Sequence, residues 1–143
     1  NYKDIYDVLN SIFMQAIEEN LRDVAEGGSF YEEYIKAASL LVQYRNVVIH
    51  VYNSKNRDIV TNYLERLTAE IVRGYIARKS EGQNISDKDL EFISYFYSYA
   101  IIGSTYKWIE SGMKADFKHF IGKIADSIDA TLPVMISKAG KAD

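Results

Sequence analysis

The segment from Asp87 to Ser111 constrains the fold most, because it is apolar around most of a helical circumference. At about 100° per residue, its apolar side chains fall in two stripes rather than one. A helix on the surface of a globular domain shows a single apolar stripe, so a helix with two must be covered on two sides. The polar remainder is narrow and consists of Lys88, Glu91, Ser94, Ser98 and Thr105.

Two arrangements would cover both stripes. In the first, the segment is the central core helix of a monomer. In the second, one stripe faces the core and the other a symmetry mate, so that two copies of this helix and two of the last helix form a four-helix interface. Small residues at Ser98, Ala100, Gly103 and Ser104 would allow another helix to approach closely.

The rest of the chain also predicts helices, so we expect an all-α fold. Apolar residues recur at spacings of three and four in residues 4–25, 29–43, 57–79 and 116–132. Ser29 and Ser86 are the expected N-caps of two of these helices. Residues 44–52 are rich in β-branched side chains, which favour a β-strand. Because an isolated strand would have no partner in this chain, a short buried helix is expected there. Pro133 should end or kink the last helix, and the result is an orthogonal or antiparallel bundle of about five to six helices.

Length and composition fit a single domain spanning residues 1–143. Hydrophobic residues make up 48% and charged residues 26% of the 143, and there is no cysteine. The net charge is −3, whereas a nucleic-acid-binding domain normally shows a basic face. There is no apolar run long enough for a membrane span, and the first residues do not resemble a signal peptide. Without an initiator methionine, the chain is expected to be a piece of a longer protein.

The sequence gives no sign of catalysis, of a metal or of a cofactor. Its two histidines, His50 and His119, fall in different helices, whereas a zinc site needs three or four ligands. The adjacent pairs Glu18-Glu19 and Glu32-Glu33 diverge on a helix and fit solvated faces better than acid–base chemistry. Neither a glycine-rich phosphate loop nor a nucleophile elbow is present. We therefore expect a protein that is not an enzyme.

Two motifs at the end of the long helix are similar to a known family. Residues Tyr99–Gly103 (YAIIG) and then Trp108–Met113 (WIESGM) resemble the penultimate helix of TetR/AcrR-family transcriptional regulators, and in particular the branch that includes DhaS-like regulators. Residues Tyr2–Leu9 resemble the exit from that family's DNA-binding head, although the family usually has a lysine where Ile5 stands. The resemblance implies a cytoplasmic homodimer whose helix-turn-helix head, absent from this chain, would precede residue 1.

The resemblance also implies an effector pocket inside the domain, between its first helices and the penultimate one. The chain has 12 tyrosines, many on apolar faces, and ligand pockets are mostly apolar and aromatic with a few polar groups. A small hydrophobic or aromatic effector is therefore expected, with Arg45 and His50 as polar anchors. The expected lining residues are Phe13, Ile17, Tyr34, Tyr44, Tyr63, Leu67, Tyr95 and Tyr99.

For the dimer, we expect the stripe with Tyr97, Ile101, Ser104 and Trp108 to face the partner, and Tyr95, Tyr99 and Tyr106 to point inward. The last helix should add Phe117, Phe120, Ile121, Ile124 and Ile128 to the interface. An alternative function is a helical module that responds to a protein partner, without a small-molecule ligand. A small helical enzyme ranks lower because catalytic groups are lacking.

Overall fold

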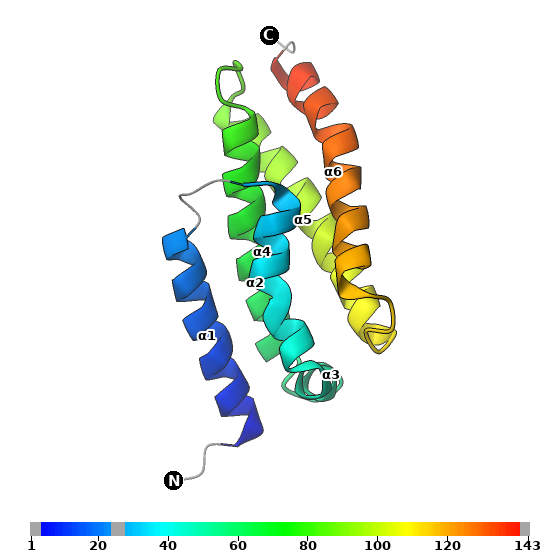
Figure 1. Ribbon diagram of the computed structural model, residues 1–143. Helices are drawn as coiled ribbons and strands as arrows, with labels where there is room; N and C mark the ends of the chain where they lie inside the picture. Colours follow the sequence, from blue (N-terminus) through cyan, green and yellow to red (C-terminus); the bar gives the residue numbers. More distant parts are fainter. Residues whose placement is uncertain (1–3, 24–27, 141–143) are drawn as a thin grey trace.

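Six helices make up the part of the chain that the structure describes, and the expected all-α class is confirmed. The computed structural model describes residues 4–23 and 28–140, with residues 20–23 as backbone only. The described part contains no strand (Figure 1). The helices are α1 (Ile5–Asp23), α2 (Phe30–Gln43), α3 (Arg45–Tyr52), α4 (Asp58–Lys79), α5 (Asp87–Glu110) and α6 (Phe117–Gly140).

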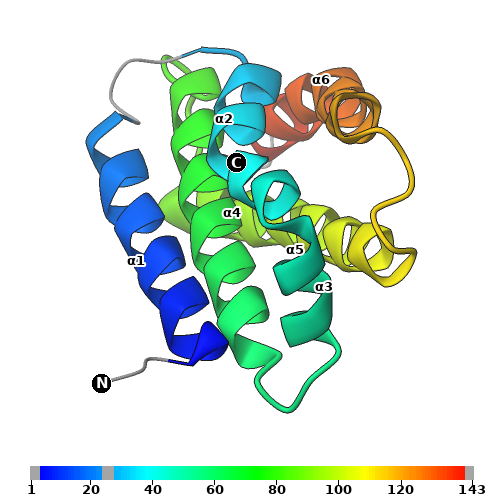
Figure 2. The same ribbon diagram turned by 60° about the horizontal axis from the view of Figure 1, so that its bottom comes forward.

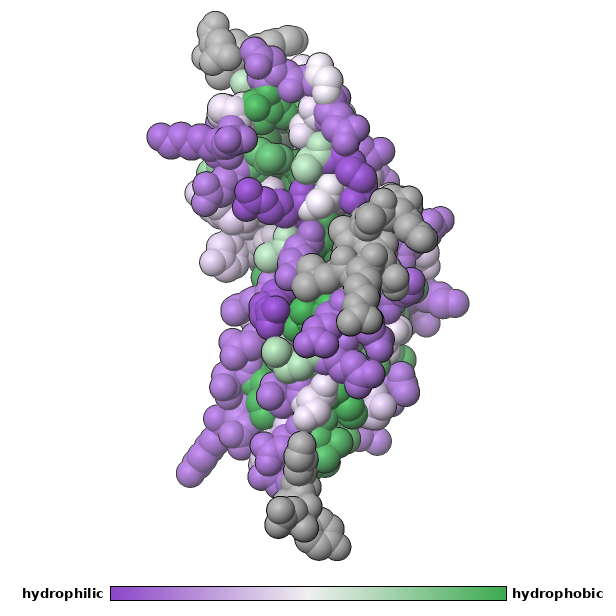
Figure 3. All heavy atoms as spheres, turned by 90° about the vertical axis from the view of Figure 1, so that its left-hand side faces the viewer, coloured by the Kyte–Doolittle hydropathy of each residue, from purple (hydrophilic) through white to green (hydrophobic). Residues whose placement is uncertain are grey.

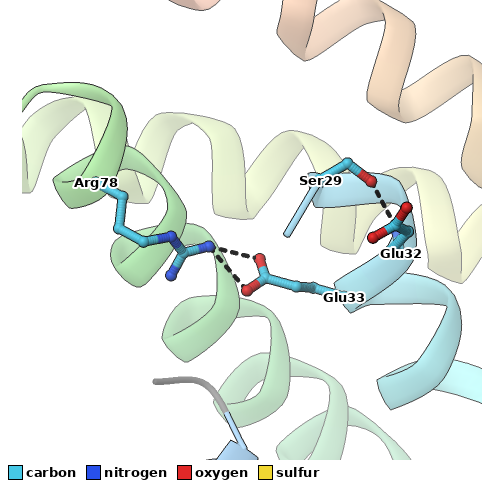
Figure 4. A network of polar contacts seen from close by, with 4 residues as sticks. All are labelled: Ser29, Glu32, Glu33 and Arg78. Atoms are coloured by element: carbon cyan, nitrogen blue, oxygen red, sulfur yellow. Dashed lines mark hydrogen bonds and ion pairs between the residues drawn. The ribbon is translucent and has the colours of Figure 1, made fainter. Parts of the chain in front are cut away.

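Helix starts follow the capping signals in the sequence. Ser29 Oγ accepts a hydrogen bond from the backbone amide of Glu32, and Ser86 Oγ accepts one from Asp89, each at 3.1 Å. Such a cap satisfies an amide that has no partner within the helix. Beside the first cap, Arg78 donates to both carboxylate oxygens of Glu33 at 2.8 Å and ties the start of α2 to the end of α4 (Figure 4).

The central helix is α4, which contacts α1, α2, α3 and α5 (Figures 1 and 2). Its buried face supplies Val60, Leu64, Leu67 and Ile71, each at most 2% exposed. Helix α6 lies on the side of the bundle away from α1 and packs on α2 and α5. The β-branched segment forms α3, as expected, with Val48 and Val51 fully buried.

Helix α5 has one buried face within the chain, and three of the five residues in its polar remainder lie on that face. Ser94, Ser98 and Thr105 are 7%, 7% and 1% exposed, whereas Lys88 and Glu91 are exposed. Thr105 satisfies its hydroxyl by donating to the carbonyl of Ile101. The aromatic side chains on the opposite face of α5 are therefore left outward, while Tyr97 and Trp108 remain buried.

The sequence predicted where the first and last helices end. The last helix was expected to end or kink near Pro133; the end is wrong, because α6 continues through the proline to Gly140. Leu132 and Ile136 are each 2% exposed, and this packing on both sides of the proline offsets the lost backbone hydrogen bond. The predicted end of the first helix at Ala25 lies outside the described residues. Among the described helices, none has the length and apolar character needed to cross a membrane.

Candidate functional site

An apolar groove of about 390 Å³ separates α5 from α6. At one end the Trp108 ring stacks on Phe120, with centroids 5.3 Å apart. At the other end the hydroxyls of Tyr97 and Thr131 lie 2.6 Å apart. These contacts join the two helices at either end of the groove. It is lined by Phe96, Tyr97, Ala100, Ile101, Ser104, Phe120, Lys123, Ile124, Ser127, Ile128 and Thr131.

An exposed aromatic stripe runs along α5 beside this groove. It consists of Phe92, Tyr95, Phe96 and Tyr99, which are 46%, 49%, 51% and 68% exposed. The Phe92 ring contacts those of Tyr95 and Phe96, at centroid distances of 5.2 and 6.0 Å. On the face that carries α1, by contrast, hydrophilic residues dominate and apolar ones show only in small patches (Figure 3). A contiguous apolar surface of this kind marks an interaction site.

Gly103 stands at the C-terminal end of the aromatic stripe, flanked by Ala100 and Ser104. A Cβ atom built on Gly103 would meet nothing within 4 Å, so the fold of the single chain does not require glycine there. Glycine in a helix interior costs about 0.5–1 kcal/mol relative to alanine. An exposed mid-helix glycine beside an apolar groove therefore leaves room for another backbone to approach closely.

A second hollow, the α1–α4 crevice, has a volume of about 280 Å³. Its floor is formed by Phe13 and Tyr63, whose rings stack with centroids 4.0 Å apart and an interplanar angle of 10°. Aromatic pairs in such contact stabilise by more than their buried area alone. The full lining is Asn10, Phe13, Met14, Ile17, Ile59, Asn62, Tyr63, Glu65 and Arg66, so the crevice combines an apolar floor with a polar rim.

The centre of the core is filled by hydrogen-bonded tyrosines. The Tyr34 hydroxyl lies 3.0 Å from Thr68 Oγ1, and both residues are fully buried. Tyr63 donates to the carbonyl of Ala37 at 2.9 Å. Burial raises the pKa of both phenols, although the hydrogen bonds of Tyr34 to Thr68 and Thr105 oppose the shift there.

The turn after α5 explains the Trp108–Met113 motif. The amide of Met113 donates to the carbonyl of Trp108 and that of Gly112 to Ile109, each at 2.9 Å. Gly112 has φ 83°, a left-handed conformation that glycine adopts without strain and that closes a helix in this pattern. The Trp108 indole then donates to the carbonyl of Ala115 at 2.9 Å. The motif thus fixes the angle at which α6 leaves α5.

Comparison with known families identifies the family to which a chain with this helix order and this turn belongs. The family model TetR_C_8, described as a transcriptional regulator C-terminal region, matches residues 28–130. The chain belongs to this TetR family. No match was found among curated proteins, and none among solved structures.

The expected effector residues of this TetR-family domain lie in several places rather than around one cavity. Phe13, Ile17 and Tyr63 line the α1–α4 crevice, whereas Tyr34 and Leu67 are buried in the core. The remaining residues lie at the surface or at helix junctions, as follows. Tyr44 is half-buried at the α2–α3 junction, Arg45 donates to the Gly112 carbonyl, exposed His50 stacks on Tyr6, and Tyr95 and Tyr99 line a hollow between α4 and α5.

The burial of α5 within the single chain departs from the expected orientation at several residues. Tyr97, Ile101 and Trp108 are only 7%, 2% and 5% exposed, although Tyr97, Ile101 and Ser104 also line the α5–α6 groove. Tyr95 and Tyr99 are exposed, whereas they were expected to point inward, and Ser94, Ser98 and Thr105 are buried in their place. Of the other residues expected at the dimer, Ser104 is exposed, Phe117, Phe120 and Ile124 are half-buried, and Ile121 and Ile128 are buried. Tyr106, expected inward, is half-buried and donates to Glu65.

Sequence reasoning missed several residues of these surfaces, among them Phe92 and Phe96 on the aromatic stripe and Asn10, Asn62 and Arg66 on the crevice rim. The two phenylalanines lie on the apolar circumference of α5 but were not assigned to an interface. The three polar residues gave no usable signal, because polar side chains at the edge of an amphipathic helix are also expected on a solvated face.

The buried phenols predict a loss of stability at alkaline pH. Tyr34 and Tyr63 have a raised pKa in the folded state, so above about pH 10 the unfolded chain releases protons that the folded chain retains. The free energy of unfolding should fall by about 1.4 kcal/mol per pH unit for each such tyrosine. Urea unfolding at pH 8 to 11 measures this, and Tyr34→Phe should reduce the slope. A flat profile would contradict the burial of these hydroxyls.

Proposed function

We propose that this chain is the effector-binding and dimerisation domain of a TetR-like transcriptional regulator. In this proposal a helix-turn-helix head precedes α1, and a small, mainly hydrophobic effector changes the position of α1. The domain itself is not an enzyme and acts in the cytoplasm. The Trp108–Met113 motif also supports placing the chain in the branch of the DhaS-like regulators.

The observation that carries the dimer is the exposed apolar face of α5. The aromatic stripe, Gly103 and the rim of the α5–α6 groove form one continuous surface. In a dimer with two-fold symmetry, the same patch on both subunits covers itself. A partner's α5 lying across Gly103, with the two α6 helices beside it, would bury all four rings of the stripe.

The α1–α4 crevice is the effector site that the geometry favours. It is built half from α1, the helix that would carry the head, and half from α4, the central helix. A ligand seated there touches both and so can distinguish two positions of α1. That differential contact is required, because a ligand that binds both states equally shifts nothing.

Thermal unfolding against a panel of small hydrophobic and aromatic compounds tests the effector proposal. A compound present at 100 times its Kd should stabilise the domain by about 2.7 kcal/mol. Its binding should be lost in Phe13→Ala, which removes the crevice floor, and retained in Tyr99→Ala, which alters the outer surface. Failure of the whole panel to raise the unfolding temperature would count against a small-molecule effector.

A second candidate is a domain that responds to a protein partner. The filled core favours it, because Tyr34, Leu41, Leu64 and Thr68 are all 0% exposed and leave no room beside them for a ligand. In that case the exposed stripe of α5 would bind the partner. A chain that remains monomeric and binds no compound would favour this candidate over the first.

A further inference from the structure

The rim of the α1–α4 crevice carries a cation that no described acidic side chain neutralises. Within the described residues, the one hydrogen-bond contact of Arg66 is a long one, from Nη1 to the sulfur of Met14 at 3.8 Å. The ion pair in this part of the chain is Arg78 with Glu33, elsewhere on α4. An arginine without a paired carboxylate at the edge of a hollow has most of its donors available to a ligand.

The neighbouring acids are directed elsewhere. Glu65 also lines the crevice, but its Oε1 accepts from the Tyr106 hydroxyl on α5 at 3.4 Å. Glu70, one turn along from Arg66, forms no ion pair with it, and its Oε2 is buried without a partner in the described residues. Burial raises the pKa of Glu70, and the charge of Arg66 opposes this only in part. Neither carboxylate therefore forms an ion pair with the guanidinium of Arg66.

The other lining groups fit a small molecule with one charged end. Met14, Ile17 and Ile59 add apolar lining beside the buried Phe13 and Tyr63 rings, which stack on each other. Asn10 and Asn62 add amide donors and acceptors at the rim. The volume of about 280 Å³ is just below the range of about 300–1,000 Å³ typical of ligand pockets, which suits a single ring or a short chain.

We propose that the ligand of the α1–α4 crevice is a small organic monocarboxylate with an aromatic or short aliphatic body. Its carboxylate pairs with Arg66, and its body lies against the apolar lining at Phe13, Met14 and Ile59. A guanidinium binds a carboxylate through two parallel hydrogen bonds. A single cation with Glu65 close by favours a monoanion over a dianionic phosphate. The inference rests on the proposed effector function and adds the charge of the ligand.

Calorimetric titration of the 143-residue chain with matched ligands tests this charge. Benzoate and hexanoate are the probes, and benzamide and hexanamide are their neutral counterparts. At least one carboxylate should bind, and its amide should bind at least tenfold more weakly. Arg66→Gln should weaken carboxylate binding by about 10- to 100-fold, since hydrogen bonds to charged groups contribute about 1.5–3 kcal/mol.

Arg73→Gln is the matched control, because Arg73 lies on the same helix but lines the hollow between α4 and α5. Carboxylate binding to this variant should remain within twofold of the parent. Equal binding of carboxylate and amide, or a normal affinity in Arg66→Gln, overturns the inference. Binding of neutral compounds alone also overturns it, yet leaves the proposed effector function standing. Unfolding curves of both variants should match the parent, since both arginines are exposed.

Discussion

Replacing Gly103 with leucine is expected to convert the dimer into a monomer while the chain keeps its fold. Nothing within 4 Å would meet a Cβ at this position in the single chain, so a larger side chain is tolerated there. In the dimer, the same side chain would separate the two α5 helices where they cross. The dissociation constant should rise at least about 100-fold, or about 2.8 kcal/mol, as measured by sedimentation equilibrium.

Two further variants make this result specific. Gly103→Ala should stabilise the isolated chain by about 0.5–1 kcal/mol through helix propensity and weaken the dimer less than leucine does. Asp126→Leu adds the same side chain at an exposed position of α6 that does not line the α5–α6 groove. This variant should sediment with the same dimer mass as the parent. A Gly103→Leu protein that remains dimeric would place the interface elsewhere on the molecule.

Phe13→Ala is expected to cost about 3–5 kcal/mol of unfolding free energy, the usual cost of removing a buried phenylalanine ring. Phe13 is 1% exposed and stacks on Tyr63 at 4.0 Å. Little else in the crevice can fill the space, because the hollow lies directly above the ring. Since domains of this size are stable by only about 5–15 kcal/mol, urea unfolding should show a large shift of the midpoint.

The neighbouring residue supplies the control. Met14 is 43% exposed and lies at the rim of the same crevice, so Met14→Ala should cost less than about 1 kcal/mol. If Phe13→Ala were as mild as Met14→Ala, α1 would not be packed on α4 as described. The effector proposal would then lose its structural basis, because the crevice exists only where these two helices meet.

The sequence predicted the helices well, since their signals are local. Serine caps at Ser29 and Ser86 and the glycine at Gly112 are each recognised within a few residues of the helix end. Residues 45–52 were assigned correctly only because an isolated strand has no partner, which is a global argument. The continuation of α6 beyond Pro133 was not predicted, because a local pattern does not show the buried packing on both sides of the proline.

The orientation of α5 was predicted less well, for a physical reason. Hydrophobicity places large aromatic residues inside and serines outside, which is the usual outcome. Here Ser94 and Ser98 are buried on the side of α5 that faces α4, so the rings of Phe92, Tyr95, Phe96 and Tyr99 are left on the outer face. A single sequence cannot distinguish a stripe buried in its own chain from one buried between two chains. The candidate crevice was found in part, through Phe13, Ile17 and Tyr63, whereas Arg66 required the structure.

Sedimentation velocity of the unmodified chain, over a range of micromolar concentrations, tests the central claim most directly. The roles proposed for the exposed aromatic stripe and for Gly103 require a second chain that covers them. We predict a species of twice the chain mass of 16.4 kDa that dissociates on dilution. A single species of 16.4 kDa throughout that range would contradict the dimer, and with it the role assigned to the outer face of α5.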